Sequence, residues 1–243
     1  MSAPISPRHA DRLVDKLSES ALFRDLADRA SQHRLKAGDE PLSEFLWKST
    51  QCQQQDARNS KFIQGLRYGN LDPTDFGGYM VQDSIYCYYC KGDIDIAATK
   101  ATDPNLREFL EQRSKSYITY YEEMFKKWHI IDGSGIELNK ECKDYADLEK
   151  NVAETMDPLY LVVALIPCHK LWPWLGQQIT WPQHDFGVYE SWVTSNLNPC
   201  SQSYRKLDKI IDDAFLVGAI DKEQALCVYR GCMIGEATFF SSV

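Results

Sequence analysis

The pair Asp-Pro occurs three times in the chain, at residues 72–73, 103–104 and 157–158, and each pair precedes a stretch with helical spacing of apolar residues. An aspartate carboxylate caps a helix by accepting a free backbone N–H, and proline suits the first helical position because it has no N–H to leave unpaired. These pairs therefore predict the starts of three long helices. Asp221, with Gln224 three residues later, predicts a fourth start of the capping-box kind.

Helical spacing continues through most of the remaining chain, and no alternation of apolar and polar residues is long enough to predict a strand. With no repeat and no Gly/Ser linker in 243 residues, the sequence predicts one all-α domain of eight or nine helices. An amphipathic helix over residues 8–34, set off by Gly38 and Pro41, predicts an N-terminal helical extension over residues 1–42, followed by the main domain over residues 43–243. Further helices are expected from about Leu42 through Cys52, around Phe62 to Leu66, and over residues 145–154, 157–181, 186–196, 201–215 and 222–240.

The composition argues against several classes of partner. A formal net charge of −8 disfavours nucleic acid and anionic membrane surfaces, both of which attract a basic face. The longest apolar run, Leu159 to Cys168, is far shorter than the roughly 18–20 residues of a membrane-spanning helix. The first 30 residues carry no secretory signal, so the eight cysteines are expected to be free thiols in a reducing, cytoplasmic compartment.

Two carboxylates interrupt helix faces that should be apolar. Asp83 lies within an aromatic stripe of the helix that begins at Asp72, and Glu236 lies on the apolar face of the last helix. A carboxylate in such a place is either paired or has a shifted pKa. The structural alternatives are a hydrogen bond from a tyrosine hydroxyl or a helix end to Asp83, and an ion pair between Glu236 and Arg113 or Arg230.

Cys168 occupies an unusual place in the most hydrophobic segment of the chain. Pro167 leaves the carbonyl of Val163 without its helical partner and bends the helix, and two tryptophans follow. A cysteine at a kink in a buried helix is better placed for chemistry than one in a regular turn, although core cysteines are commonly inert. If the faces that carry this thiol and the two carboxylates converge, they form a pocket.

The other cysteines and the histidines carry weaker signals. Cys87 and Cys90 match C-x-x-C, but a redox pair is typical of a βαβ unit rather than the middle of a helix. Zinc would require a second pair, and Cys227 and Cys232 are poorly spaced for one. No Glu-x-x-His motif indicates an iron site. The sequence therefore predicts no metal site.

Three blocks of sequence resemble the TenA/thiaminase II family of haem-oxygenase-like proteins. The first is F-x-x-x-x-x-x-G-x-L followed by F-x-x-Y-x-x-Q-D-x-x-Y, matched between Phe62 and Tyr86. The second, Ala164 to Cys168, resembles the block around the family's cysteine nucleophile, and the third is Gly235-Glu236 with Phe239 and Phe240. The resemblance covers about residues 43–243 and implies a single haem-oxygenase-like helical bundle.

Carried over position by position, the resemblance implies a role for five residues. Cys168 falls on the nucleophile and Glu236 on the acid/base, while Asp83 and Tyr86 fall on residues that hold an aminopyrimidine ring. Tyr145 falls on a further tyrosine of that pocket. The implied activity is cofactor-independent hydrolysis of an aminopyrimidine in thiamin salvage. The implied substrate is 4-amino-5-aminomethyl-2-methylpyrimidine, with thiamin as a poorer or alternative one.

Two substrate-binding positions depart from the family pattern. Trp172 stands where a tyrosine is usual, and Asn196 stands where another pocket tyrosine is expected. Both changes alter the shape and hydrogen bonding of the pocket, which leaves open a binding protein for another flat heterocycle on the same scaffold. An oxygen-using enzyme of this superfamily is disfavoured because His and Glu ligands do not cluster in the sequence. The implied partners are a small pyrimidine and further copies of the chain, in a dimer or tetramer.

Overall fold

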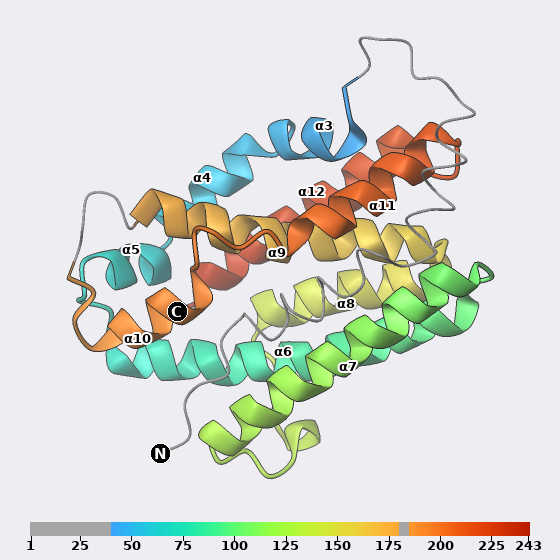
Figure 1. Cartoon of the computed structure of the whole chain (residues 1–243). Helices are drawn as coiled ribbons and strands as arrows, with labels where there is room; N and C mark the ends of the chain where they lie inside the picture. Colours follow the sequence, from blue (N-terminus) through green and yellow to red (C-terminus); the bar gives the residue numbers. More distant parts are fainter. Residues whose placement is uncertain (1–39, 180–184) are drawn as a thin grey trace.

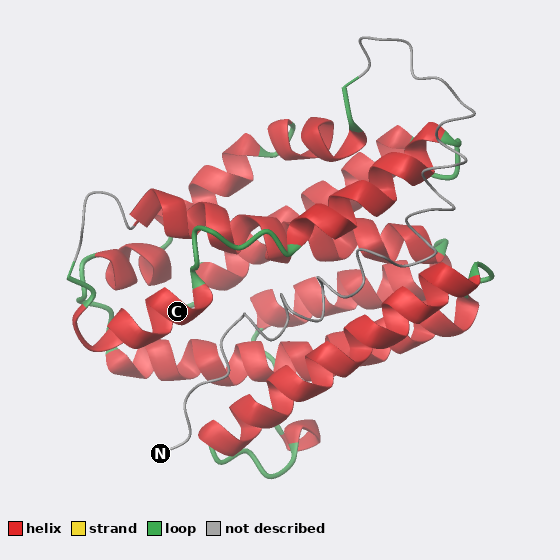
Figure 2. Cartoon of the chain, in the orientation of Figure 1, coloured by secondary structure: helices red, strands yellow, loops and turns green. Residues whose placement is uncertain are grey.

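The computed structural model describes residues 40–179 and 185–243, and every regular element within these two ranges is helical (Figure 2). The α-helices are α3 (Leu42–Lys48), α4 (Gln51–Asn59), α5 (Lys61–Arg67), α6 (Pro73–Lys100), α7 (Pro104–Lys127), α8 (Lys140–Thr155), α9 (Pro158–Ile179), α10 (Glu190–Asn196), α11 (Tyr204–Leu216) and α12 (Lys222–Phe240). Two short 3-10 helices, η1 (Gly133–Gly135) and η2 (Gly187–Tyr189), lie in the connections. The predicted all-α fold is confirmed, with ten α-helices in the described ranges in place of the expected eight or nine.

The capped helices begin where the sequence predicts. The carboxylate of Asp72 accepts the backbone N–H of Thr74 at 2.7 Å at the start of α6. Asp103 accepts two N–H groups in the same way at the start of α7, and Asp221 accepts the N–H of Gln224 at 2.8 Å at the start of α12. These bonds satisfy N–H groups that no helical carbonyl can reach.

The stretch from Leu42 through Cys52, expected as one helix, is divided between α3 and α4. The chain turns at Ser49 and Thr50, where the hydroxyl of Thr50 donates to the carbonyls of Leu46 at 3.0 Å and Trp47 at 3.1 Å. The hydroxyl supplies these last carbonyls of α3 with a donor in place of the backbone N–H groups of a further helical turn, and the first helix ends here.

Two other predicted ranges need correction or lie beyond the described chain. Helix α8 begins at Lys140 rather than at Tyr145, because the side chain of Asn139 caps it by accepting the N–H of Cys142 at 2.9 Å. The amphipathic stretch over residues 8–34 and the last residues expected in the helix over 157–181 lie outside the described residues.

Helix α9 runs through the middle of the bundle and packs against α8, α11 and α12 (Figure 1). By length and composition it could span a membrane, but 72% of its apolar window is buried inside the fold, as in the core helix of a bundle. Pro167 and Pro173 interrupt its hydrogen-bond ladder on either side of Cys168 and Trp172. The core helix is therefore irregular at the position where the sequence predicts chemistry.

Helices α6 and α7 form a long antiparallel pair, and α6 also packs against α8 and α9 (Figure 1). Helix α12 packs against α8 and α9 from the other side of the bundle. The interior between these helices receives side chains from segments far apart in the sequence: Asp83 from α6, Cys168 from α9 and Glu236 from α12.

The end of α6 is joined to the end of α8 by one side chain. The ammonium group of Lys100 donates to the backbone carbonyls of Ala153 at 2.8 Å, Glu154 at 3.0 Å and Met156 at 2.6 Å. Carbonyls at the end of a helix have no helical N–H partner, and a cation there also complements the helix dipole. Lys100 therefore fixes the position of α8, which carries Tyr145.

Candidate active site

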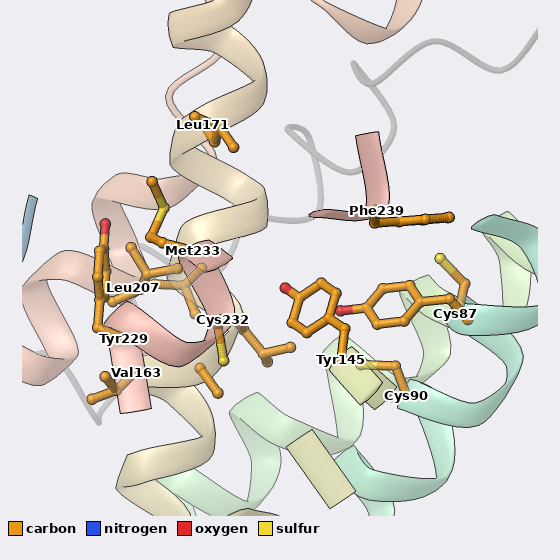
Figure 3. Close-up of a cluster of buried hydrophobic side chains, with 14 of the residues drawn as sticks. Cys87, Cys90, Tyr145, Val163, Leu171, Leu207, Tyr229, Cys232, Met233 and Phe239 are labelled. Atoms are coloured by element: carbon orange, nitrogen blue, oxygen red, sulfur yellow. The ribbon is translucent and has the colours of Figure 1, made fainter. Parts of the chain in front are cut away.

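A tyrosine holds the carboxylate of Glu236 inside the bundle. The hydroxyl of Tyr145, on α8, donates to Oε1 of Glu236, on α12, at 3.0 Å, and both side chains are buried. Figure 3 shows Tyr145 within the buried cluster, beside Cys87, Cys90 and Phe239. The alternative of an ion pair with Arg113 or Arg230 is wrong, because no ion pair in the described part of the chain joins either arginine to Glu236, whose partner is Tyr145.

Gly235 allows Tyr145 to come this close to α12. A Cβ atom at position 235 would lie 2.6 Å from both Cγ and Cδ2 of the tyrosine ring. Two carbon atoms that are not bonded to each other cannot approach this closely. The ring thus packs directly on the backbone of α12. This contact places the phenol hydroxyl beside the carboxylate of the next residue, Glu236.

Burial raises the pKa of Glu236 from an ordinary value of 4.5 to about 7. The hydrogen bond from Tyr145 opposes that rise, the charge of Asp83 adds to it, and the Trp172 indole and the Cys168 thiol each lower the pKa. The indole N–H of Trp172 has no hydrogen-bond partner in the part of the chain that the structure describes, so Tyr145 is the direct donor to Glu236. A carboxyl group with a pKa near 7 is populated in both protonation states at neutral pH, as general acid–base catalysis requires.

Asp83 is the second buried acid of this interior. Its Oδ2 accepts a hydrogen bond from the hydroxyl of Tyr120 on α7 at 2.9 Å, so the tyrosine partner considered from the sequence is present. Burial raises the pKa of Asp83 to about 6, and the bond from Tyr120 opposes that rise. No described residue donates to Oδ1, which leaves this oxygen able to accept a hydrogen bond from a ligand.

Cys168 lies within electrostatic reach of both acids. Desolvation raises the pKa of its thiol well above the ordinary value, and Glu236 and Asp83 raise it further, so the resting sulfur is a thiol rather than a thiolate. Burial raises the pKa of Cys87 and Cys90, in the middle of α6, in the same direction, but these two side chains are buried whereas Cys168 is half-buried. The structure therefore brings Asp83, Cys168 and Glu236 together, and Cys168 keeps access for a reaction partner.

Tyr86 connects this interior to a third buried acid that the sequence analysis missed. Its hydroxyl donates to Oε2 of Glu149 at 2.7 Å, and its ring stacks on that of Tyr145 with centroids 4.9 Å apart. Glu149 is fully buried, none of the described residues donates a hydrogen bond to its Oε1, and burial raises its pKa to about 8. With its hydroxyl bound to Glu149, Tyr86 can contribute its ring face to a bound molecule.

The two positions that depart from the family pattern differ in their surroundings. The ring of Trp172 packs against those of Phe240 and Trp192, each with centroids 5.7 Å apart. Asn196, at the end of α10, donates from its amide to the carbonyl of Trp192 at 2.8 Å within its own helix. Trp172 thus lies beside Glu236, while no hydrogen bond among residues 40–179 and 185–243 links Asn196 to another predicted site residue.

A pocket of about 410 Å³ lies elsewhere on the molecule, between α4 and α12. None of the predicted site residues lines it. Its lining consists of Gln53, Asp56, Asn59, Ser60, Ile234, Ala237, Thr238 and Ser241. It opens on the face of α12 opposite to Glu236, and no cysteine lines it, so the candidate reactive groups lie in the interior rather than here.

No family model matches the chain, and no curated protein matches its sequence. Solved structures do match its fold. A TenA homologue from P. horikoshii OT3 is 19% identical with a TM-score of 0.71, and covers 83% of this chain and 97% of its own. A TenA family transcription regulator from Silicibacter sp. TM1040 is 14% identical with a TM-score of 0.69, and covers 83% of this chain and 95% of its own. A protein from Sulfolobus solfataricus P2, described provisionally as a TenA-like thiaminase, is 19% identical with a TM-score of 0.60, and covers 82% of this chain and 93% of its own. The chain therefore has the helical, haem-oxygenase-like fold of the TenA proteins, as the resemblance implies.

Proposed function

We propose that the protein is a TenA-type enzyme that hydrolyses an aminopyrimidine in thiamin metabolism. The observation that carries the proposal is the meeting of a half-buried thiol, Cys168, with Glu236, a carboxyl group whose pKa is about 7. The description of a structural neighbour as a TenA-like thiaminase supports the same class of substrate. The favoured substrate is 4-amino-5-aminomethyl-2-methylpyrimidine.

Asp83 has the properties needed to bind the pyrimidine. With a pKa of about 6 it is largely ionised at neutral pH, and its Oδ1 accepts no hydrogen bond from the described residues. A carboxylate that accepts hydrogen bonds from a protonated ring nitrogen and the 4-amino group favours the electron-poor form of the ring. The stacked rings of Tyr86 and Tyr145 offer an aromatic face beside it.

Glu236 and Cys168 together can supply the nucleophile. The sulfur of Cys168 bonds to an electron-poor carbon of the pyrimidine ring. Because the resting sulfur is a thiol, its proton must leave as this bond forms, and the Glu236 carboxylate is the base within reach. The electron pair then expels the amine from the exocyclic methylene, and Glu236 returns the proton to the departing nitrogen. The amine leaves as ammonia when the substrate is the aminomethylpyrimidine.

Water completes the reaction. Glu236, again a carboxylate, takes a proton from water as its oxygen bonds to the exocyclic methylene. The carbon–sulfur bond breaks, the aromatic ring is restored, and the sulfur regains its proton from Glu236. The products are the hydroxymethylpyrimidine and ammonia, and the protein returns to its starting state.

A turnover assay with the aminomethylpyrimidine tests this proposal, with ammonia release as the readout. We expect Cys168→Ala to lower the turnover number at least about a thousandfold while the melting temperature stays near that of the wild type. Cys87→Ala removes a buried thiol from the regular part of α6 and is the matched control, which should keep most activity.

Saturable binding of the pyrimidine without turnover by the wild-type protein would contradict the enzymatic proposal. That result would favour the alternative, a protein that binds a small heterocycle on the same scaffold. Full activity of Cys168→Ala would instead show that the reaction does not pass through this sulfur.

A further inference from the structure

Arg113 is a buried cation that forms no ion pair with any residue in the described ranges. It lies on α7 and is 6% exposed. Its guanidinium carbon lies 5.6 Å from the centroid of the Phe109 ring, one turn earlier on α7. A guanidinium stays charged in proteins, and a buried charge without a partner is unfavourable, so a group that pairs with it would stabilise the protein.

Two further polar groups lie around Arg113, and neither forms a hydrogen bond with a described residue. Tyr117, one turn further along α7, is buried, and no described residue bonds to its hydroxyl. On α9, Nε2 of His169 is buried and has no hydrogen-bond partner within residues 40–179 and 185–243. The charge of Arg113 acts on Tyr117, on Cys168 and on His169, which places all three within its electrostatic reach.

Arg113, Tyr117 and His169 each offer a hydrogen-bond donor that no described residue accepts, and together they are complementary to an anionic oxygen. The guanidinium has only donors, and the tyrosine hydroxyl is a donor. Burial and the nearby charge of Arg113 lower the pKa of His169 well below its ordinary value, so the imidazole is neutral and can present an N–H at Nε2. No hydrogen bond joins Arg113, Tyr117 and His169 to one another among the described residues. Carboxylate and phosphate oxygens are the acceptors that such a set of donors selects.

Helix α7 relates these donors to the proposed ring-binding acid. Tyr120, which bonds to Asp83, lies on the same face of α7 as Tyr117 and Arg113, at spacings of three and seven residues. At 1.5 Å per residue, Arg113 lies roughly 10 Å along the axis from Tyr120. A molecule that binds Asp83 with its ring therefore needs an extended substituent to reach the guanidinium.

We propose that Arg113, Tyr117 and His169 form an oxyanion-binding subsite beside Cys168, which receives a carboxylate or phosphate carried on the substrate's leaving group. The place of this subsite in the reaction rests on the proposed function, whereas the binding of an oxyanion does not. The subsite thereby adds to the favoured aminomethylpyrimidine a second class of substrate, aminopyrimidines whose departing amine bears an anionic tail.

Calorimetric titration of the full chain with inorganic phosphate and with acetate, at constant ionic strength, tests the subsite directly. We expect saturable binding of at least one of them, and at least tenfold weaker binding to Arg113→Gln. Arg230→Gln removes an exposed arginine from α12 and is the matched control, which should bind like the wild type. Phosphate binding without acetate binding identifies a phosphate tail, and the reverse identifies a carboxylate.

Arg113→Met keeps the length of the side chain without its charge, and it replaces the Gln variant if that one fails to fold. Binding that is absent from the wild type, or is equal in the wild type and the Arg113 variants, overturns the proposal.

Measurements of turnover separate this proposal from the proposed function. The ratio of kcat/KM for an amine bearing a tail to that for the plain aminomethylpyrimidine should fall at least tenfold in Arg113→Gln. Phosphate or acetate binding that depends on Arg113, in a protein with no turnover, contradicts the proposed reaction and supports the subsite.

Discussion

Replacing Glu236 by glutamine should make the protein more stable at pH 8 while abolishing its turnover. Glutamine keeps an oxygen that can accept the hydrogen bond from Tyr145 and has almost the same volume, but it cannot ionise. Glu236 has a pKa of about 7 in the folded protein against an ordinary 4.5. As the pH rises, the unfolded chain therefore gives up this proton before the folded protein does.

The sign and size of the effect follow from those two values. The stability that the neutral Glu236 contributes is fully present below about pH 4.5 and is lost as the pH rises through about 7, because the buried carboxylate is then charged. The gap between the two pKa values corresponds to about 3 kcal/mol. Glu236→Gln avoids this loss, so its free energy of unfolding should exceed that of the wild type by about 3 kcal/mol at pH 8, or about 6–12 °C in Tm.

Urea denaturation of both proteins at pH 5 and at pH 8 measures the difference, with most of the gain expected only at pH 8. Glu111→Gln replaces an exposed glutamate on α7 and should change the free energy of unfolding by less than about 0.5 kcal/mol at either pH. A Glu236→Gln variant that is less stable than the wild type at pH 8, or more stable by the same amount at both pH values, would refute this prediction. Either result would show that ionisation of Glu236 does not lower the free energy of unfolding.

Two further predictions concern Asp83 and Lys100. Asp83→Asn should weaken binding of the aminomethylpyrimidine by about one to two decades at pH 8, because a charge-assisted hydrogen bond is worth about 1.5–3 kcal/mol. Calorimetric titration measures this, and unchanged affinity would make Asp83 a structural acid. Lys100→Met should lower the free energy of unfolding by about 0.5–1.5 kcal/mol, because three carbonyls near the end of α8 exchange their ammonium donor for water. An unchanged urea midpoint would contradict this.

The parts of the fold that follow from local chemistry could be predicted from the sequence. The caps at Asp72, Asp103 and Asp221 lie at the expected positions because a cap involves residues only two or three apart. The break at Thr50 was missed since its cause, a hydroxyl that bonds back to the carbonyl of Leu46, leaves no mark on the apolar spacing. The acids on apolar faces were found by that spacing.

The partners of those acids could not be predicted, because they come from other helices. Tyr145 and Glu236 are 91 positions apart, and nothing in the spacing of either helix indicates the other. Glu149 lies on the buried face of α8 with Cys142 and Tyr145, so the rule that singled out Asp83 applies to it as well. It was missed because the helix was expected to begin only at Tyr145, which left too short a stretch to define a face.

The contact between Gly235 and the ring of Tyr145 restricts how this pair of positions can change over generations. Every single-nucleotide change that alters a glycine codon to another amino acid introduces a Cβ atom, and at Gly235 that atom would lie 2.6 Å from the ring. The tyrosine would have to shrink first, and the shorter side chain would lose the hydroxyl that holds Glu236. Neither Gly235 nor Tyr145 can therefore be substituted alone without loss of the contact or of the hydrogen bond to Glu236. Lineages that keep the reaction are expected to keep the two together, or to exchange both in one step along with the acid that they support.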